Sequence, residues 1–247
     1  MLARFLSAAI ILFWITMTVL LVRSELWPGQ SKLRTVPVEL VAKMFWARQQ
    51  PSDLTIFSEK HRVGHLHLHP KIRKEDGARI LEFSGNLQWR LPGSEKQRVS
   101  WGGTAIFDAE LSLSSLQIGV PVGESPLMKA QVTVTPLENL ARYQLLNNEI
   151  ELEQEDYALD ESGLKKVLKQ LDLDPALYES VRGSATVPVV SARQDSLTIP
   201  EGRIETFLVS VKQGGQTLLE VHVNQLGVIA LVKTLVGYSM ASEGVRP

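Results

Sequence analysis

Histidines at alternate positions form the main concentration of side chains suited to metal chemistry. His65, His67 and His69 lie in the segment RVGHLHLH, with Leu66 and Leu68 between them. In an extended strand, alternate residues project from one face at steps of roughly 6.6–7 Å, so the imidazoles share a face. Two alternating histidines can bind one metal ion. A solvated sheet face that packs its leucines inward gives the same pattern, and we favour that interpretation.

A second alternation places glutamates on every other residue of the segment EIELEQE. These residues are Glu149, Glu151, Glu153 and Glu155. The spacing predicts a strand whose acidic side faces solvent. A calcium site or a contact with a basic partner is the functional alternative. If this strand lay beside the histidine strand, His–Glu pairs would form an acid-sensitive surface.

Other signatures of catalysis are missing from the sequence. It has no glycine-rich phosphate loop, no HExxH motif and no GxSxG elbow. It also has no cysteine, which excludes disulfides, thiolate metal sites and a catalytic thiol. We therefore expect a protein that is not an enzyme and uses no cofactor. A metal-dependent enzyme built on the three histidines is the less favoured alternative.

The bulk composition is that of a folded globular protein. Of the 247 residues, 44% are hydrophobic and 21% are charged. The formal net charge of −1 creates no global field that would attract nucleic acid, so we expect no nucleic-acid partner.

The N-terminal segment FLSAAIILFWITMTVLLV carries no charge between positions 5 and 22. As a helix it would reach about 27 Å, close to the hydrocarbon thickness of a bilayer. We predict that residues 1–24 form a transmembrane anchor, with the apolar positions Phe5, Ile11, Phe13, Trp14, Leu20 and Val22 in lipid. A cleaved signal peptide is one alternative, but its apolar region is usually about 7–15 residues long. A buried helix of a soluble domain is the other.

The location of the remaining chain depends on the orientation of this anchor. Arg4 lies before it, and Arg23 and Lys32 follow it, so counting charges leaves the orientation open. A short head before an apolar run is typical of a translocation signal. We therefore expect a single-pass protein of the cytoplasmic membrane whose bulk is extracytoplasmic, or periplasmic.

The rest of the sequence predicts a linker at residues 25–36 and one β-rich domain at residues 37–242. Pro37 fits the first turn of a helix that ends before Pro51. This helix either docks on the domain or lies flat on the membrane. About ten to twelve alternating segments with hairpin-length connections then predict an antiparallel meander. The expected fold is mainly β (α+β): a large curved sheet or half-barrel wrapping a few short helices.

One predicted helix has the spacing of a lid over such a sheet. Its apolar residues stand at i, i+3, i+4 and i+7 and are Leu164, Val167, Leu168 and Leu171. Asp174-Pro175 opens a second, shorter helix.

The last hairpin allows a prediction of register. A two-residue Gly214-Gly215 loop would place Val209 opposite Glu220. A one-residue shift turns a whole strand over. We therefore predict a Gly214–Gln216 loop with a glycine bulge, which pairs Val209 with Val221.

Two segments resemble a known family. These are the helix and turn that lead into His61–Leu68, and the closing stretch FLVSVKQGGQTLLEVHVNQLGVIALV. They resemble bacterial periplasmic domains of unknown function whose fold is similar to lipoprotein carriers of the LolA/LolB type. The resemblance implies a curved sheet around an apolar cavity that accepts acyl chains. An uncleaved anchor would hold the chain at the membrane, whereas a soluble carrier diffuses between membranes.

The favoured function is therefore a non-enzymatic binding module for a lipid, a lipoprotein or another apolar ligand. The alternative is a structural or interaction subunit of an envelope complex, which would contact its partner through an exposed strand edge or the acidic face.

Overall fold

The computed structural model describes residues 34–89, 97–122, 127–159, 166, 188–200 and 202–245. The chain divides into two units, Met1–Arg34 and Thr35–Pro247. The predicted anchor residues and the predicted lid residues both lie outside the described residues. Lys166, the one described residue between positions 160 and 187, is helical. Within the described ranges, no helix has the length and apolarity needed to cross a membrane.

The second unit opens with strand β1 (Thr35–Val36) and helix α2 (Val38–Arg48). Pro37 precedes the helix, and Gln49 ends it in the left-handed conformation. The predicted helix is therefore confirmed. Its side chains Val41 and Trp46 are buried, and the Trp46 ring lies 5.7 Å from that of Phe107, centroid to centroid. The helix thus docks on the sheet.

The remaining elements are strands, apart from the short 3-10 helix η2 (Pro136–Glu138). Their bounds are β2 (Ser52–Ser58), β3 (His61–Ile72), β4 (Arg79–Trp89), β5 (Gln97–Phe107), β6 (Leu113–Pro121), β7 (Met128–Thr135), β8 (Leu140–Asn147), β9 (Ile150–Ala158), β10 (Val189–Ile199), β11 (Gly202–Gln213), β12 (Gln216–Asn224), β13 (Ile229–Thr234) and β14 (Tyr238–Ala241).

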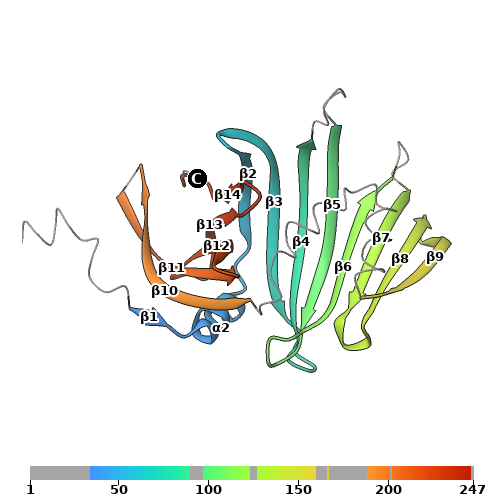
Figure 1. Ribbon diagram of the computed structural model, residues 1–247, viewed down its shortest axis with the longest axis horizontal. Coiled ribbons are helices and arrows are strands. Elements are labelled where there is room, and N and C mark those ends of the chain that lie inside the picture. The colour runs from blue at the N-terminus through green and yellow to red at the C-terminus, as the bar shows by residue number, and fades with distance from the viewer. Residues whose placement is uncertain are drawn as a thin grey trace, which may run out of the picture. The chain divides into compact units, whose positions relative to one another are not determined.

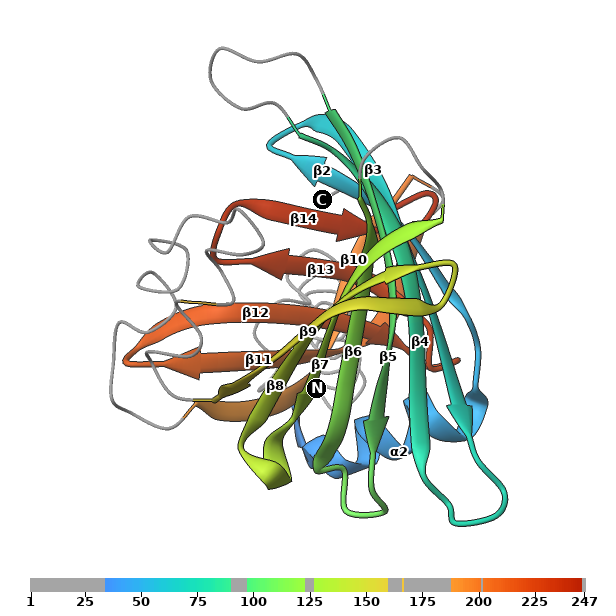
Figure 2. The same ribbon diagram turned by 90° about the vertical axis from the view of Figure 1, so that its right-hand side faces the viewer.

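All these strands join one 14-stranded antiparallel sheet in the order β1-β10-β11-β12-β13-β14-β2-β3-β4-β5-β6-β7-β8-β9 (Figure 1). Two meanders compose it, β2 to β9 and β10 to β14, and the pairing of β14 with β2 joins them. Figure 2 shows β11 to β14 running across the direction of β4 to β7, so the sheet is strongly curved. The predicted mainly β fold with one large curved antiparallel sheet is confirmed, with α2 as the one α-helix bounded within the described residues.

Strand register assigns the side chains of β3 to β8 to two faces. Directly paired residues of neighbouring strands project from the same face. One row of partners, which defines the apolar face, runs Leu68, Phe83, Gly103, Ile118, Val132 and Tyr143. The next row, which defines the polar face, runs His67, Ser84, Gly102, Gly119, Gln131 and Gln144.

Two clusters of buried residues stabilise the other half of the sheet. One lies where α2 meets the sheet and contains Val36, Val41, Ala192 and Val223. The other contains Ala230, Leu231, Ala241 and Val245, with Ile199 and Ile204 packed against it. Both clusters draw on β1, β10 to β14 and the elements next to them. The well-packed core therefore lies away from β4 to β8.

The last hairpin has the predicted pairing but not the predicted loop. Val209 pairs with Val221, as expected. However, Gln213 pairs with Gln216, so the loop is the two residues Gly214 and Gly215. Both glycines have positive φ, at 56° and 82°, which a tight hairpin turn requires. A bulge after Val211 restores the register that the short loop would otherwise shift.

A second bulge overturns the predicted single acidic face of β9. Leu145 pairs with Glu153, but Leu146 pairs with Glu151, so Leu152 is the extra residue. Glu153 therefore shares the apolar face with Leu145, while Glu151 lies on the polar face. Alternation in the sequence cannot reveal this change because a bulge adds one residue without changing the pattern.

Candidate functional site

The apolar face of β4 to β8 forms a surface of partly exposed large side chains. Phe83, Ile118 and Val132 are only half-buried. The small residues between such side chains are buried instead, as with Ala105 at 6% and Ala141 at 1% exposure. Neither cluster of buried residues in the described part of the chain contains a residue from β4 to β8. The apolar side chains of this face therefore retain surface that a ligand could cover.

Aromatic rings fill the space above glycines on this face. A Cβ atom added to Gly85 would lie 2.7 Å from Cζ2 of Trp101, its cross-strand partner. A Cβ atom added to Gly103 would lie 2.5 Å from Cζ of its partner Phe83. The rings can lie low against the sheet only because these positions lack a side chain. Trp101 thus packs across strands against Gly85.

Tyrosines and glutamates border the apolar face at its β8–β9 edge. Tyr143 pairs with Glu155, and Tyr157 donates a hydrogen bond to Glu155. Burial, this hydrogen bond and the nearby carboxylates raise the pKa of Tyr157 to about 12. Burial and the charges of Glu153 and Glu155 also raise the pKa of Tyr143. Both phenols therefore stay protonated at neutral pH and act as hydrogen-bond donors at the rim.

The polar face holds the predicted histidine cluster. His65, His67 and His69 share this face, as predicted. The rings of His67 and His69 meet edge to face with centroids 6.4 Å apart. His67 Nδ1 lies 2.6 Å from Asp53 Oδ1, on the neighbouring strand β2. Nevertheless, the described residues contain no group of three or more His, Cys, Asp or Glu side chains that could hold a metal ion.

The acidic strand does not approach these histidines. β3 pairs with β2 and β4, whereas β9 lies at the far edge of the sheet. The suggested His–Glu surface is therefore wrong. His222, the histidine outside β3, is buried on β12, where its Nδ1 lies 3.3 Å from Thr206 Oγ1. Burial lowers the pKa of His222.

An open cleft of about 640 Å³ adjoins His65 and His67. Its polar lining comes from five places in the chain and includes Asp53, Thr55, Arg62, His65, His67, Ser84, Asn86, Ser100 and Glu243. Arg62 Nη2 donates a hydrogen bond to the His65 ring. Sequence reasoning identified the histidines here but missed their neighbours. Asp53 lies 14 residues from His67 along the chain, and only the strand register brings the two together.

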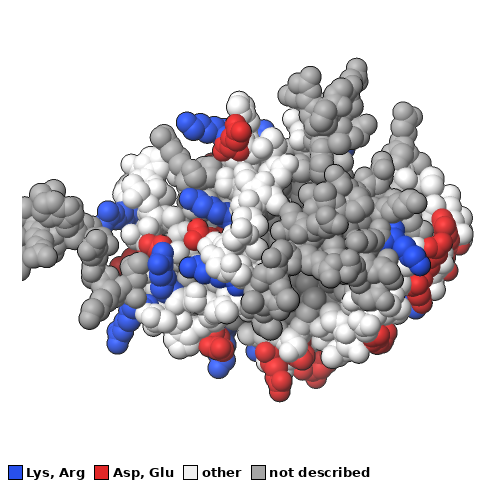
Figure 3. All heavy atoms as spheres, viewed as in Figure 1, with Lys and Arg blue, Asp and Glu red and all other residues white. Residues whose placement is uncertain are grey.

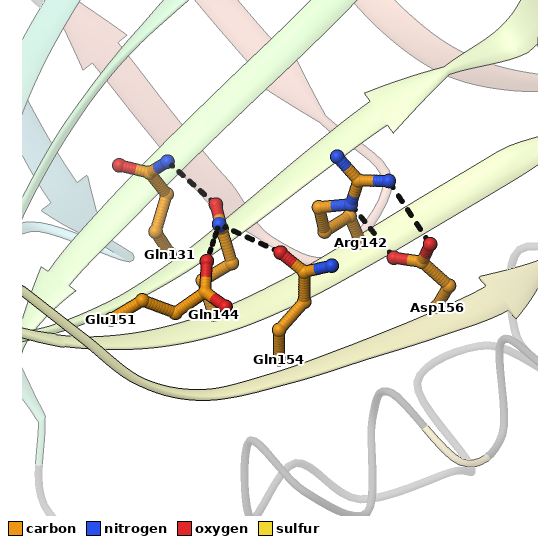
Figure 4. A network of polar contacts seen from close by, with 6 residues as sticks. All are labelled: Gln131, Arg142, Gln144, Glu151, Gln154 and Asp156. Atoms are coloured by element: carbon orange, nitrogen blue, oxygen red, sulfur yellow. Dashed lines mark hydrogen bonds and ion pairs between the residues drawn. The ribbon is translucent and has the colours of Figure 1, made fainter.

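Further along the polar face, side-chain hydrogen bonds connect the last three strands of the meander (Figure 4). Gln144 accepts a hydrogen bond from Gln131, and it donates to Glu151 at 2.8 Å and to Gln154 at 3.2 Å. Arg142 forms a two-pronged ion pair with Asp156. Every group in this network already has a partner, so it supports the sheet edge rather than forming a reactive site.

No protein-family model matches the sequence, and a search of curated proteins finds no similar sequence. Among solved structures, the crystal structure of a β-barrel-like protein of domain of unknown function DUF1849 from Brucella abortus is similar to this chain. The two share 9% sequence identity with a TM-score of 0.38, over 77% of this chain and 92% of that chain. The resemblance to LolA/LolB-type carriers is not confirmed by these comparisons.

Proposed function

We propose that the protein is a membrane-anchored, extracytoplasmic binding module that holds the apolar part of a lipid, a lipoprotein or a similar ligand against the apolar face of β4 to β8. The module acts by binding and not by catalysis. Its N-terminal anchor keeps the sheet close to the source of such ligands.

The partial exposure of large apolar side chains carries this proposal. Aliphatic and aromatic side chains of consecutive strands line the apolar face, and they include Phe83, Ile118 and Val132. Covering apolar surface contributes about 25 cal/mol per Å², so an acyl chain that removes a few hundred Å² from water would bind favourably. The Tyr143 hydroxyl at the β8–β9 rim offers a donor to the polar end of such a ligand.

Because the chain has no cysteine, single labelled positions can test this proposal directly. The variants Val132→Cys and Thr133→Cys place the same small fluorophore on the apolar face and on the polar face of β7, respectively. The full chain is reconstituted in nanodiscs and titrated with a nitroxide-labelled fatty acid. We expect strong quenching of the fluorophore at position 132 and little at position 133, because the two side chains point to opposite faces.

Equal quenching at the two positions would contradict the proposal, because it would show that the fatty acid merely partitions into the nanodisc. Addition of excess unlabelled fatty acid is the competition control. It should restore the emission at position 132 and leave that at position 133 unchanged.

A second candidate function is that of an interaction subunit, and the β9 edge favours it. In the described part of the chain, β9 pairs only with β8. Its residues Ile150 and Leu152 are 67% and 55% exposed. Acidic side chains gather in this region (Figure 3). An extended partner segment with basic side chains would both extend the sheet and complement this charge.

Photo-crosslinking in native membranes tests the second candidate. A photoactivatable residue at position 152 should capture one partner whose cross-linked segment is rich in lysine or arginine. The same residue at position 137, which is 84% exposed in η2, is the matched control and should not capture that partner. Recovery of an unpartnered monomer from position 152 would count against this function.

A further inference from the structure

Two oppositely charged side chains without a countercharge line the cleft on the polar face. Arg62 and Glu243 both border it. The ion pairs of the described residues are His67–Asp53, Lys71–Glu82, Arg73–Asp76 and Arg142–Asp156, and neither Arg62 nor Glu243 takes part in them. Arg62 donates to the His65 ring instead, and this imidazole offers no negative charge.

The other acidic group of the cleft is already engaged. The Asp53 carboxylate accepts a hydrogen bond from His67 Nδ1 at 2.6 Å through its Oδ1 atom. Within the described residues, Arg62 is the cation that lines the cleft, and Glu243 is the carboxylate of its lining that has no histidine partner. A guanidinium group matches a carboxylate or phosphate through two parallel hydrogen bonds. A carboxylate accepts from an ammonium group.

Neutral side chains that can form hydrogen bonds line the cleft on neighbouring strands. Thr55, Asn86 and Ser100 lie in one cross-strand row, as His65 pairs with Thr55 on one side and with Asn86 on the other, and Asn86 pairs with Ser100. Ser84 pairs with His67 in the neighbouring row. These hydroxyls and the amide can donate and accept, which suits a small polar ligand.

We propose that this cleft binds a small zwitterion, whose anionic group pairs with Arg62 and whose ammonium group pairs with Glu243. The volume of about 640 Å³ lies within the range of roughly 300–1,000 Å³ typical of small-molecule sites, and it accommodates an amino acid, a dipeptide or a phosphoethanolamine group. The site lies on the face opposite the apolar one. It is therefore separate from the proposed function and does not depend on it.

Calorimetric titration of the full chain in detergent micelles tests the pairing. The probes are alanine, dialanine and phosphoethanolamine. Alanine amide lacks the anionic group, and N-acetylalanine lacks the ammonium group. We expect at least one zwitterionic probe to bind. If alanine binds, alanine amide and N-acetylalanine should each bind about 10-fold more weakly than alanine itself.

Two variants assign the charges to their residues. Arg62→Gln should weaken binding of the zwitterion about 10-fold and leave binding of an analogue without the anionic group unchanged. Glu243→Gln should weaken the zwitterion similarly and leave an analogue without the ammonium group unchanged. Lys60→Gln and Glu59→Gln, at exposed positions in the β2–β3 turn outside the cleft lining, are matched controls that should not alter binding.

The nature of the anionic group separates two sources of the ligand. Preference for dialanine or alanine indicates a free amino acid or peptide. Preference for phosphoethanolamine, together with Arg62-dependent binding of phosphatidylethanolamine vesicles, indicates a lipid headgroup. The proposal is overturned if no zwitterionic probe binds at millimolar concentration, or if the Arg62 and Glu243 variants bind the zwitterion as the unmodified chain does.

Discussion

The indole of Trp101 lies against Gly85, its direct partner on the neighbouring strand, in the space that a side chain at position 85 would need. Phe83 and Gly103, two residues further along the two strands, form the same relationship with the ring on β4 and the glycine on β5. The aromatic rings therefore lie low on the apolar face of β4 and β5.

Substitution of Gly85 by alanine tests this packing. Its Cβ atom would lie 2.7 Å from both Trp101 Cζ2 and the backbone oxygen of His65, so the strands must shift. We expect Gly85→Ala to lower the free energy of unfolding by about 1–3 kcal/mol, measured by chemical denaturation.

Gly102→Ala is the matched control for that measurement. Its Cβ atom would point to the polar face and would meet no atom closer than 3.6 Å. An added methyl group there also restricts the unfolded chain, so stability should stay the same or rise slightly. Similar losses of stability in both variants would show that the contact between Trp101 and Gly85 does not cause the loss.

Helix α2 should contribute strongly to stability through one side chain. Trp46 is 6% exposed, and its ring meets those of Phe45 and Phe107 at 5.1 and 5.7 Å between centroids. Trp46→Ala should cost about 3–5 kcal/mol in the free energy of unfolding because it leaves a cavity under the helix. Leu40→Ala, on the same helix but 56% exposed, should cost far less. A small loss for Trp46→Ala would mean that the helix is only loosely docked.

His222 should make the fold sensitive to acid. Burial lowers its pKa below the ordinary value of 6.5, so the unfolded chain takes up a proton more readily than the folded one. Neutral His222 makes its full contribution to the free energy of unfolding at pH values above the pKa that it has in the unfolded chain. This contribution is lost as the pH falls from about 6.5 toward the lower pKa that His222 has in the folded chain.

Denaturation at a series of pH values measures this effect. The variant His222→Gln should show a weaker fall in stability below pH 6.5 than the unmodified chain, whereas His61→Gln, at an exposed position, should retain the full dependence. The idea fails if the pH dependence of the two variants is the same.

Local patterns in the sequence were sufficient to predict the sheet and its two faces. The alternation of His65, Leu66 and His67 predicted which side chains share a face, and the register confirms it. Pro37 and Pro51 predicted the extent of α2 because proline is favoured only in the first turn of a helix. In the last hairpin, the pairing of Val209 with Val221 followed from matching apolar residues.

Bulges and long-range neighbours were not predictable in this way. Leu152 is an extra residue in β9, and it divides the acidic residues between the two faces although their alternation in the sequence is regular. The cleft also combines Arg62 with Glu243, which are separated by most of the chain. Their proximity follows from the pairing of β14 with β2, and no local pattern indicates which strands meet when two meanders join.

Photo-crosslinking with a diazirine fatty acid in living cells tests the central claim most directly, because mass spectrometry then identifies the residues that contact the acyl chain. We predict adducts at residues on the apolar face of β6 and β7, such as Ile118 and Val132. The yield of these adducts should fall in the variant Val132→Asp and stay unchanged in Thr133→Asp. Adducts confined to the first 24 residues, or spread equally over the two faces of β6 and β7, would contradict it.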